Sequence, residues 1–165
     1  MAIEIERKFL LKGMPSVEPH EIIDINQWYW KNKEGIWERA RSWNSNKTGL
    51  KWVHTVKTFI SVGVQEEIEK NLTEEEFNKF VERCKLKSEE ARYITKQRWI
   101  YPVDRGLYWE VDMFDTGHHL VVAEIELPKK SAKFTTPDFI QEKILMEVTS
   151  MKQFSNKNLC NKLIK

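Results

Sequence analysis

Charged side chains of one sign recur two positions apart through most of this sequence. The pairs are Glu4 and Glu6, Arg39 and Arg41, Glu67 and Glu69, Lys96 and Arg98, Glu110 and Asp112, and Glu124 and Glu126. Two further lysines, Lys8 and Lys57, accompany them. Because side chains alternate across a β-strand, both members of a pair would leave the same face. Two side chains of the same charge repel each other at this short distance. A divalent cation can offset the repulsion between carboxylates, and a polyphosphate can offset it between Arg and Lys side chains. The pattern therefore predicts a site for a metal-bound triphosphate.

The opposite faces of several of these segments are apolar. Ile3 and Ile5 oppose the first carboxylate pair, and Val121, Ala123 and Ile125 oppose the last. A sheet with one packed apolar face and one solvated charged face would alternate in the same way, and the pattern alone leaves this alternative open. Solvated faces usually mix the two signs, however, whereas these faces repeat one sign.

The segment 36–44 departs from this alternation. Its tryptophans, Trp37 and Trp43, share the face of Arg39 and Arg41. Alternation alone therefore does not place these arginines inside the fold.

The elements that must position these residues are mostly strands. Polar turns separate eight strand-like runs: one that begins at residue 2, then 21–31, 36–44, 51–59, 64–72, 92–101, 107–114 and 119–127. Thr73 and Glu76 form a capping box, which predicts a helix with Phe77 and Phe80 on its apolar face.

Two further helices are predicted after residue 130. Thr136 and Pro137 are typical of a helix start, and Ser155 would cap a final helix. The inward residues of that final helix would be Leu159, Cys160, Leu163 and Ile164. His118 and His119 are expected in a turn, where neighbouring side chains diverge, rather than as metal ligands.

Short turns between nearly all strands predict an antiparallel sheet. Eight such strands remove their exposed edges most simply by closing into a barrel. We therefore expect a mostly β (α+β) fold: a closed eight-stranded antiparallel β-barrel with a few packing helices, in a single domain over residues 1–165.

The composition excludes several classes of partner. Lys and Arg number 27 against 25 Asp and Glu, so a net charge of +2 gives no bulk field for nucleic acid or a membrane. We expect no signal peptide and no membrane span. Cys84 and Cys160 lack metal-ligand spacing and are expected to be buried free thiols, which favours a cytoplasmic protein. The oligomeric state stays open, with a homodimer as one option.

Taken in order, the charged motifs resemble the CYTH family, the triphosphate tunnel metalloenzymes. They read E-x-E-x-K at 4–8, R-x-R at 39–41, TVK ending at 57, E-x-E at 67–69, K-x-R at 96–98, E-x-D at 110–112 and E-x-E at 124–126. The resemblance implies an eight-stranded barrel whose charged interior forms a tunnel. It also implies class IV adenylate cyclase, thiamine triphosphatase or inorganic triphosphatase activity.

The resemblance also implies roles for individual residues. The triphosphate would be gripped by Lys8, Arg39, Arg41, Lys57, Lys96 and Arg98. Mg²⁺ or Mn²⁺ would be held by Glu4, Glu6, Asp112, Glu124 and Glu126. Supporting carboxylates, or ligands of a second metal, would be Glu67, Glu69 and Glu110.

A Q-W-Y motif at 27–29 resembles the family's Q-G-Y. It would place Tyr29 in the tunnel as an acid, base or water-positioning group, with Lys57 as a second catalytic group. Trp28 replaces the family's glycine, and we expect it to pack outside the barrel rather than to narrow a tunnel mouth.

The sequence favours metal-dependent hydrolysis of inorganic tripolyphosphate to pyrophosphate and phosphate. The alternatives are a class IV-type adenylate cyclase that converts ATP to cyclic AMP and pyrophosphate, a thiamine triphosphatase, and a polyphosphate-binding module without turnover. A structural β-barrel without a site also stays open. The expected partner is a small-molecule triphosphate.

Overall fold

A computed structural model describes residues 2–87, 89, 91–115 and 120–162 of the chain. The charged pairs all lie on its long strands. These strands are β1 (Ala2–Leu11), β2 (Glu21–Lys31), β3 (Trp37–Ser45), β4 (Gly49–Ser61), β5 (Val64–Leu72), β6 (Ala91–Pro102), β7 (Tyr108–Phe114) and β8 (Leu120–Leu127). His118 and His119, considered above for a turn, fall outside the described residues.

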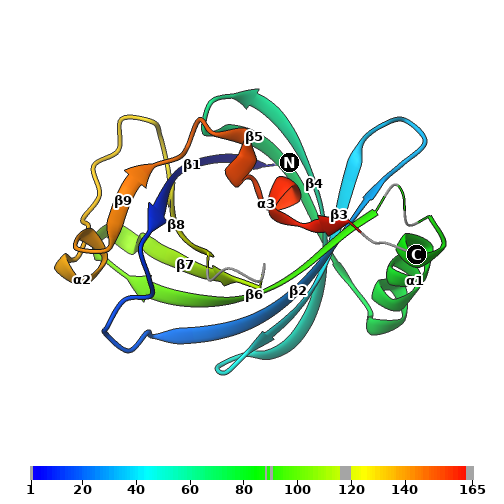
Figure 1. Cartoon of the computed structure of the whole chain (residues 1–165), viewed down its shortest axis with the longest axis horizontal. Coiled ribbons are helices and arrows are strands. Elements are labelled where there is room, and N and C mark those ends of the chain that lie inside the picture. Colours follow the sequence, from blue (N-terminus) through cyan, green and yellow to red (C-terminus); the bar gives the residue numbers. More distant parts are fainter. Residues whose placement is uncertain (1, 88, 90, 116–119, 163–165) are drawn as a thin grey trace.

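The eight long strands close into an antiparallel barrel (Figure 1). Their order is β6-β2-β3-β4-β5-β1-β8-β7, and pairing of β7 with β6 completes the circuit. Consecutive strands form two meanders, β2 to β5 and β6 to β8, and β1 joins them by pairing with β5 and β8. The predicted closed eight-stranded antiparallel barrel is confirmed.

The helices follow the prediction only in part. Helix α1 (Glu74–Leu86) begins after Thr73 with the expected capping box, and α2 is a single turn (Asp138–Gln141). The predicted final helix is wrong beyond its first turn, because α3 (Asn156–Leu159) is only one turn long and residues 161–162 form strand β10 on β6. Leu163 and Ile164 lie outside the described residues. The sequence did not predict strand β9 (Ile144–Glu147), which pairs with β1.

The main apolar core lies outside the barrel wall. Phe9, Trp109 and Ile125 leave the outer faces of β1, β7 and β8 and pack against Phe134 and Ile140 from the α2 region. The indole N–H of Trp109 donates to the carbonyl of Thr135 at 2.9 Å, which ties this outer layer to the wall. Because the outer face is covered by apolar packing, the opposite face of the same strands, which carries the charges, lines the interior.

Helix α1 covers the outer face of β3 and so resolves the ambiguity of that strand. Ala40 is fully buried against Phe77, Phe80 and Cys84 of this helix. Trp28 packs in the same outer cluster, as expected, and does not narrow a tunnel mouth. The small residue Ala40 admits the helix, and Arg39 and Arg41 are therefore turned inward.

The C-terminal segment lies across the barrel (Figure 1). The 3-10 turn η3 (Lys152–Phe154) leads into α3 (Asn156–Leu159) and β10 (Asn161–Lys162). Leu159 and Cys160 pack on an apolar cluster that contains Tyr29, Ile94 and Phe114. Among the described residues, no helix is long and apolar enough to cross a membrane.

Candidate active site

Two connected cavities occupy the barrel interior. One of about 180 Å³ has Lys8, Tyr29 and Trp37 on its walls, and we call it the mouth cavity. The other, of about 220 Å³, has Arg41 and Glu126 on its walls, and we call it the inner cavity. Five residues line both: Glu6, Arg39, Lys57, Glu124 and Asn156. The two cavities are therefore parts of one space.

Arg39 and Arg41 form an unpaired cationic wall on β3. Both are buried, and among the described residues no carboxylate lies within 4.0 Å of either guanidinium. Their Nε atoms are buried without a hydrogen-bond partner. Burial, together with the charges of Arg39 and Arg98, lowers the pKa of Arg41 to about 9. Buried unpaired charge is costly, so these two groups favour an anion in the space before them.

Lys57 and Lys8 are cations that already have carboxylate partners. The Nζ of Lys57 lies 2.8 Å from Glu4 and 3.6 Å from Glu67, its neighbour across the β4–β5 pair. The Nζ of Lys8 lies 3.3 Å from Glu124, the residue opposite it on β8. Burial opposes the charged form of Lys8 and Lys57, but these carboxylates outweigh it and raise the pKa of both. Both lysines therefore stay charged while they face the cavities.

A second group of charges, on the inward faces of β6 and β7, is already paired. Asp112 accepts from Lys96 Nζ at 2.8 Å and from Arg98 at 2.8 and 2.9 Å, and Arg98 also contacts Glu110. The Lys96 side chain is 0% exposed and that of Asp112 is 1% exposed. Burial lowers the pKa of Lys96 to about 8, whereas Arg98, with two carboxylates, has its pKa raised.

This network bears on the roles implied above. Lys96 and Asp112 share the inward faces of β6 and β7 with Arg98 and Glu110, but they line neither cavity, and their roles toward phosphate and metal stay predictions. Arg98 and Glu110 do line the inner cavity. Glu110 contacts Arg98, and its supporting role stays a prediction.

Four carboxylates, those of Glu4, Glu6, Glu124 and Glu126, face the inner cavity opposite the arginines. Glu126 stands opposite Glu6 in the β1–β8 pair. Burial, then the Glu124 charge, raises the pKa of Glu6 well above its usual value, and partial burial with Glu4 raises that of Glu126 to about 7. Lys8, Lys96 and Arg98 outweigh burial at Glu124 and hold its pKa well below the usual range.

These oxygens fit a divalent cation shared with a phosphate. Carboxylates whose pKa values rise through burial and then through mutual repulsion gain a counter-charge from such an ion. Among the described residues, no three acidic, histidine or cysteine side chains form a ready cage for a metal. Mg²⁺ is commonly bound by one or two carboxylates together with the substrate's phosphate oxygens, so a complete protein cage is not required.

Comparison with known proteins identifies the family. No protein-family model matches the sequence. An inorganic triphosphatase from Acetivibrio thermocellus is 32% identical over 161 residues, which are 96% of this chain and 94% of the relative. The chain belongs to the CYTH family of triphosphate tunnel metalloenzymes.

Two solved structures share the CYTH barrel. A crystal structure of an inorganic triphosphatase matches 98% of this chain and 100% of its own, with 25% identity and a TM-score of 0.62. A protein from Hippeastrum with a dominant triphosphatase activity matches 76% of this chain and 80% of its own. Its identity is 16% and its TM-score 0.53, so it supports the fold alone.

The remaining predicted residues of the CYTH tunnel also face the interior. Tyr29 lines the mouth cavity, directly opposite Arg39 in the β2–β3 pair. Glu67 and Glu69 line the inner cavity. Glu69 accepts from the hydroxyl of Thr55 at 3.4 Å, and Thr55 in turn faces the mouth cavity. Tyr29, Glu67 and Glu69 thus lie in the tunnel, and their roles there remain proposals.

Sequence reasoning missed several lining residues of the CYTH tunnel. Thr55, Gln65 and Tyr108 line it, and each stands two positions before a predicted site residue. Extending the two-residue spacing by one step would have found them. Asn156 carried no such signal, because it reaches the tunnel from the C-terminal segment.

The raised carboxyl pKa values predict that the metal-free CYTH barrel loses stability between pH 5.5 and pH 8. A folded state with raised pKa values binds more protons than the unfolded chain in this interval, so the free energy of unfolding falls as pH rises. The lowered pKa values of Asp112 and Glu124 act only below the ordinary carboxyl range, and Lys96, whose pKa is lowered to about 8, opposes the fall only at the upper end of the interval. We expect the melting temperature with a chelator to fall by about 5 °C.

Scanning calorimetry at the two pH values measures this change. The Glu6→Gln variant removes the carboxyl group whose pKa is raised well above its usual value and should show a smaller fall. A melting temperature that rises toward pH 8 in the unmodified protein would contradict the electrostatics described here.

Proposed function

We propose that this chain is a divalent-metal-dependent triphosphatase that hydrolyses inorganic tripolyphosphate to pyrophosphate and phosphate. The observation that carries the proposal is the pair of buried guanidiniums, Arg39 and Arg41, that face the cavities without a carboxylate partner in the described part of the chain. The relative at 32% identity is an inorganic triphosphatase, which supports the same reaction.

The arginine wall would hold the phosphate chain along β3. Arg39 reaches both cavities and Arg41 the inner one, so their guanidiniums can contact successive phosphoryl groups. Lys57, which lines both cavities, would neutralise charge that develops on the bridging oxygen as its bond to the terminal phosphorus breaks. Lys8 and Tyr29, at the mouth cavity, would contact the terminal phosphoryl group and its attacking water.

Mg²⁺ or Mn²⁺ would be held by Glu4, Glu6, Glu124 and Glu126. When bound, the ion supplies charge neutralisation to the phosphate oxygens. Asp112, proposed from the family resemblance as a fifth ligand, is instead assigned to hold Lys96 and Arg98, because its oxygens already accept from both. Glu67 and Glu69 are assigned to hold Lys57 and Thr55.

We also propose a cytoplasmic setting. Cys84 and Cys160 are free thiols in the structure, and burial raises the pKa of each to about 12. Two unreactive buried thiols that form no bridge are typical of proteins from reducing compartments.

The substrate assignment is tested with tripolyphosphate, ATP and thiamine triphosphate in parallel, each with Mg²⁺ and with Mn²⁺. The charged lining contacts phosphate and metal, so binding energy should come chiefly from the triphosphate. We expect kcat/KM for tripolyphosphate to exceed that for the two organic substrates by about tenfold or more, a difference of about 1.4 kcal/mol. ATP should yield ADP and phosphate.

Each other outcome selects an alternative. Cyclic AMP and pyrophosphate as the main products from ATP would favour the cyclase. Faster turnover of thiamine triphosphate would require an organic-group contact at the mouth, where Trp37 is the available aromatic side chain. Tight binding of tripolyphosphate without turnover, with or without metal, would leave a binding module.

A further inference from the structure

Asn156 stands where the mouth cavity and the inner cavity meet. The other four residues that line both cavities are charged side chains of barrel strands. Asn156 instead comes from α3, in the segment that lies across the barrel (Figure 1). A neutral amide therefore lines the tunnel together with the cations of Arg39 and Lys57 and the carboxylates of Glu6 and Glu124.

The side chain of Asn156 is unsatisfied at this point. Its Oδ1 is buried and has no hydrogen-bond partner among the described residues. Its backbone carbonyl is already used, because it accepts from the backbone N–H of Cys160 at 3.2 Å and from the thiol of Cys160 at 3.0 Å. A buried amide oxygen without a partner is unfavourable, so a water or ligand is expected in front of it.

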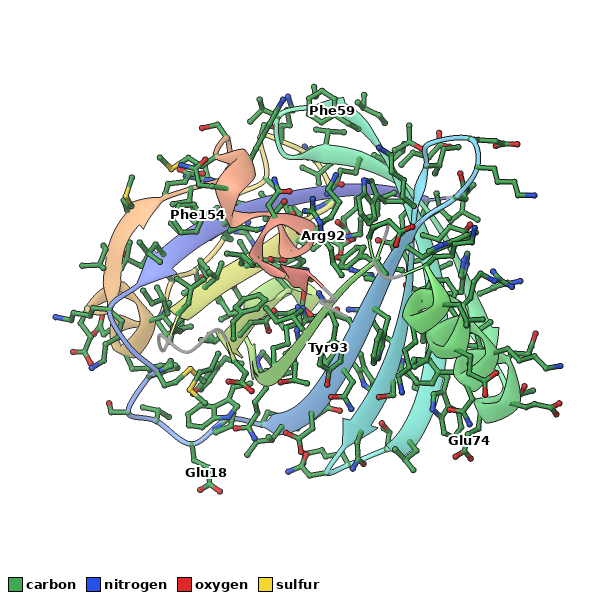
Figure 2. All side chains as sticks on the ribbon, turned by 45° about the vertical axis from the view of Figure 1, so that its right-hand side comes forward. Glu18, Phe59, Glu74, Arg92, Tyr93 and Phe154 are labelled. Carbon is green, nitrogen blue, oxygen red and sulfur yellow. The ribbon has the colours of Figure 1, made fainter. Side chains whose placement is uncertain are left out.

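The segment that carries Asn156 is held by contacts that leave its amide free. The Nζ of Lys8 donates to the carbonyl of Phe154 at 3.2 Å, which ties the segment to β1. Arg92 of β6 donates to the carbonyl of Lys157 at 3.2 Å, and Figure 2 shows Arg92 beside α3. Within the segment, Asn158 donates to the carbonyl of Lys152 at 2.7 Å. The position of Asn156 is thus fixed before any ligand arrives, which is required of a side chain that orients a reactant.

We propose that Asn156 is a catalytic residue that orients the attacking water of the hydrolysis. This proposal rests on the proposed triphosphatase function. An amide carries both an acceptor and two donors, so Oδ1 can accept from the water while Nδ2–H donates to a phosphate oxygen. A side-chain amide orients the attacking water in the same way in enzymes that hydrolyse nucleoside triphosphates.

In the step served by Asn156, the water oxygen forms a bond to the terminal phosphorus. The bond from that phosphorus to the bridging oxygen breaks, and the bridging oxygen keeps the electron pair as part of pyrophosphate. One proton of the water remains on the phosphate released, and the other passes to solvent or to a phosphate oxygen. The amide is unchanged, and a neutral group suits this place because a carboxylate would repel the substrate and a cation would hold the product.

The test compares Asn156→Ala and Asn156→Asp with the unmodified protein, using tripolyphosphate and Mn²⁺. For Asn156→Ala we expect kcat to fall by about 10- to 100-fold, with KM within about threefold and an unchanged melting temperature. Asn156→Asp keeps the size but replaces the N–H donor by a charge beside Glu6 and Glu124, so kcat should fall and KM should also rise. The control is Gln153→Ala, an exposed residue of the same segment, which should leave both constants unchanged.

The outcomes separate this inference from the proposed function. An unmodified protein that turns over no triphosphate overturns both. An active protein whose folded Asn156→Ala variant keeps kcat within twofold overturns the role of Asn156 alone. Equal rises of KM with a lowered melting temperature in both Asn156 variants would show a structural role of the segment and would also overturn it. If Asn156→Ala does not fold, the isosteric Asn156→Asp variant decides by the same two constants.

Discussion

Replacing Arg41 by alanine should remove most of the activity and leave the free protein about as stable as before. The same result is expected for Arg39→Ala. These guanidiniums have no carboxylate partner in the described part of the chain. Their two positive charges repel each other in the empty tunnel. Removing one relieves repulsion and removes a buried unpaired Nε, which offsets the packing that the arginine stem provides.

The activity loss should be large because the arginines act on charge that builds up in the transition state. Loss of one such buried donor typically lowers kcat by about 10²–10³-fold. Arg41→Lys should restore only part of this, because lysine supplies the charge without the planar fork that contacts two phosphate oxygens. Steady-state kinetics with tripolyphosphate and a thermal melt of each variant are the two measurements.

The matched control is Lys79→Ala on helix α1. Lys79 is an exposed cation, with 69% of its side chain accessible, and its only ion pair in the described residues is with Glu75 on the same helix. Its removal changes the net charge by the same amount but leaves the tunnel intact, so activity should stay unchanged. Normal activity in a folded Arg41→Ala protein would remove this arginine from the site and with it the main support for the proposed function.

The strands were predicted well from the sequence because residues two positions apart lie on the same face of a strand, and the charge pairs have this spacing. Period-two alternation placed Glu4, Glu6, Glu124 and Glu126 on one side of their strands, and the barrel register then set Glu6 opposite Glu126. What alternation could not settle was β3, where both faces carry large or charged side chains. Helix α1 settles it by covering Ala40, a contact between elements that no local pattern contains.

Two other features depended on long-range contacts in the same way. Asn156 lines the tunnel because the chain returns across the barrel after α2. There the carbonyl of Phe154 accepts from Lys8 of β1, which lies about 150 residues earlier in the sequence. The helix expected from Ser155 stops after one turn, because the chain then pairs with β6 as β10. Tertiary pairing overrode the local helical pattern here.

The pairing of Lys96 and Arg98 with Asp112 was also beyond the sequence. The three belong to neighbouring strands β6 and β7, and Arg98 stands directly opposite Asp112. Spacing within each strand indicates shared faces but not which strands are neighbours. Once the register is known, the same charges that resemble a phosphate and metal set divide into two unpaired arginines on β3 and an ion-paired group on β6 and β7 of the same barrel wall.

This division predicts that Asp112→Asn is the most destabilising single change among the site residues. The substitution leaves Lys96 and Arg98 buried with one carboxylate, Glu110, which contacts only Arg98. Breaking a buried ion pair by removing one partner typically lowers the free energy of unfolding by about 3–5 kcal/mol. Urea unfolding of the metal-free protein, followed by circular dichroism, measures the loss.

The comparison with Glu124→Gln distinguishes the structural role of Asp112 from the metal-binding role that the family resemblance implied. Glu124 pairs with Lys8 at 3.3 Å and faces both cavities, so its variant should shift the Mn²⁺ concentration needed for half-maximal activity upward. Asp112→Asn should instead lose stability with chelator present, where no metal can contribute. If Asp112→Asn unfolds at the same urea concentration as the unmodified protein and shows the metal shift, Asp112 is a ligand, and the ion-paired network on β6 and β7 is not what holds Lys96 and Arg98 in place.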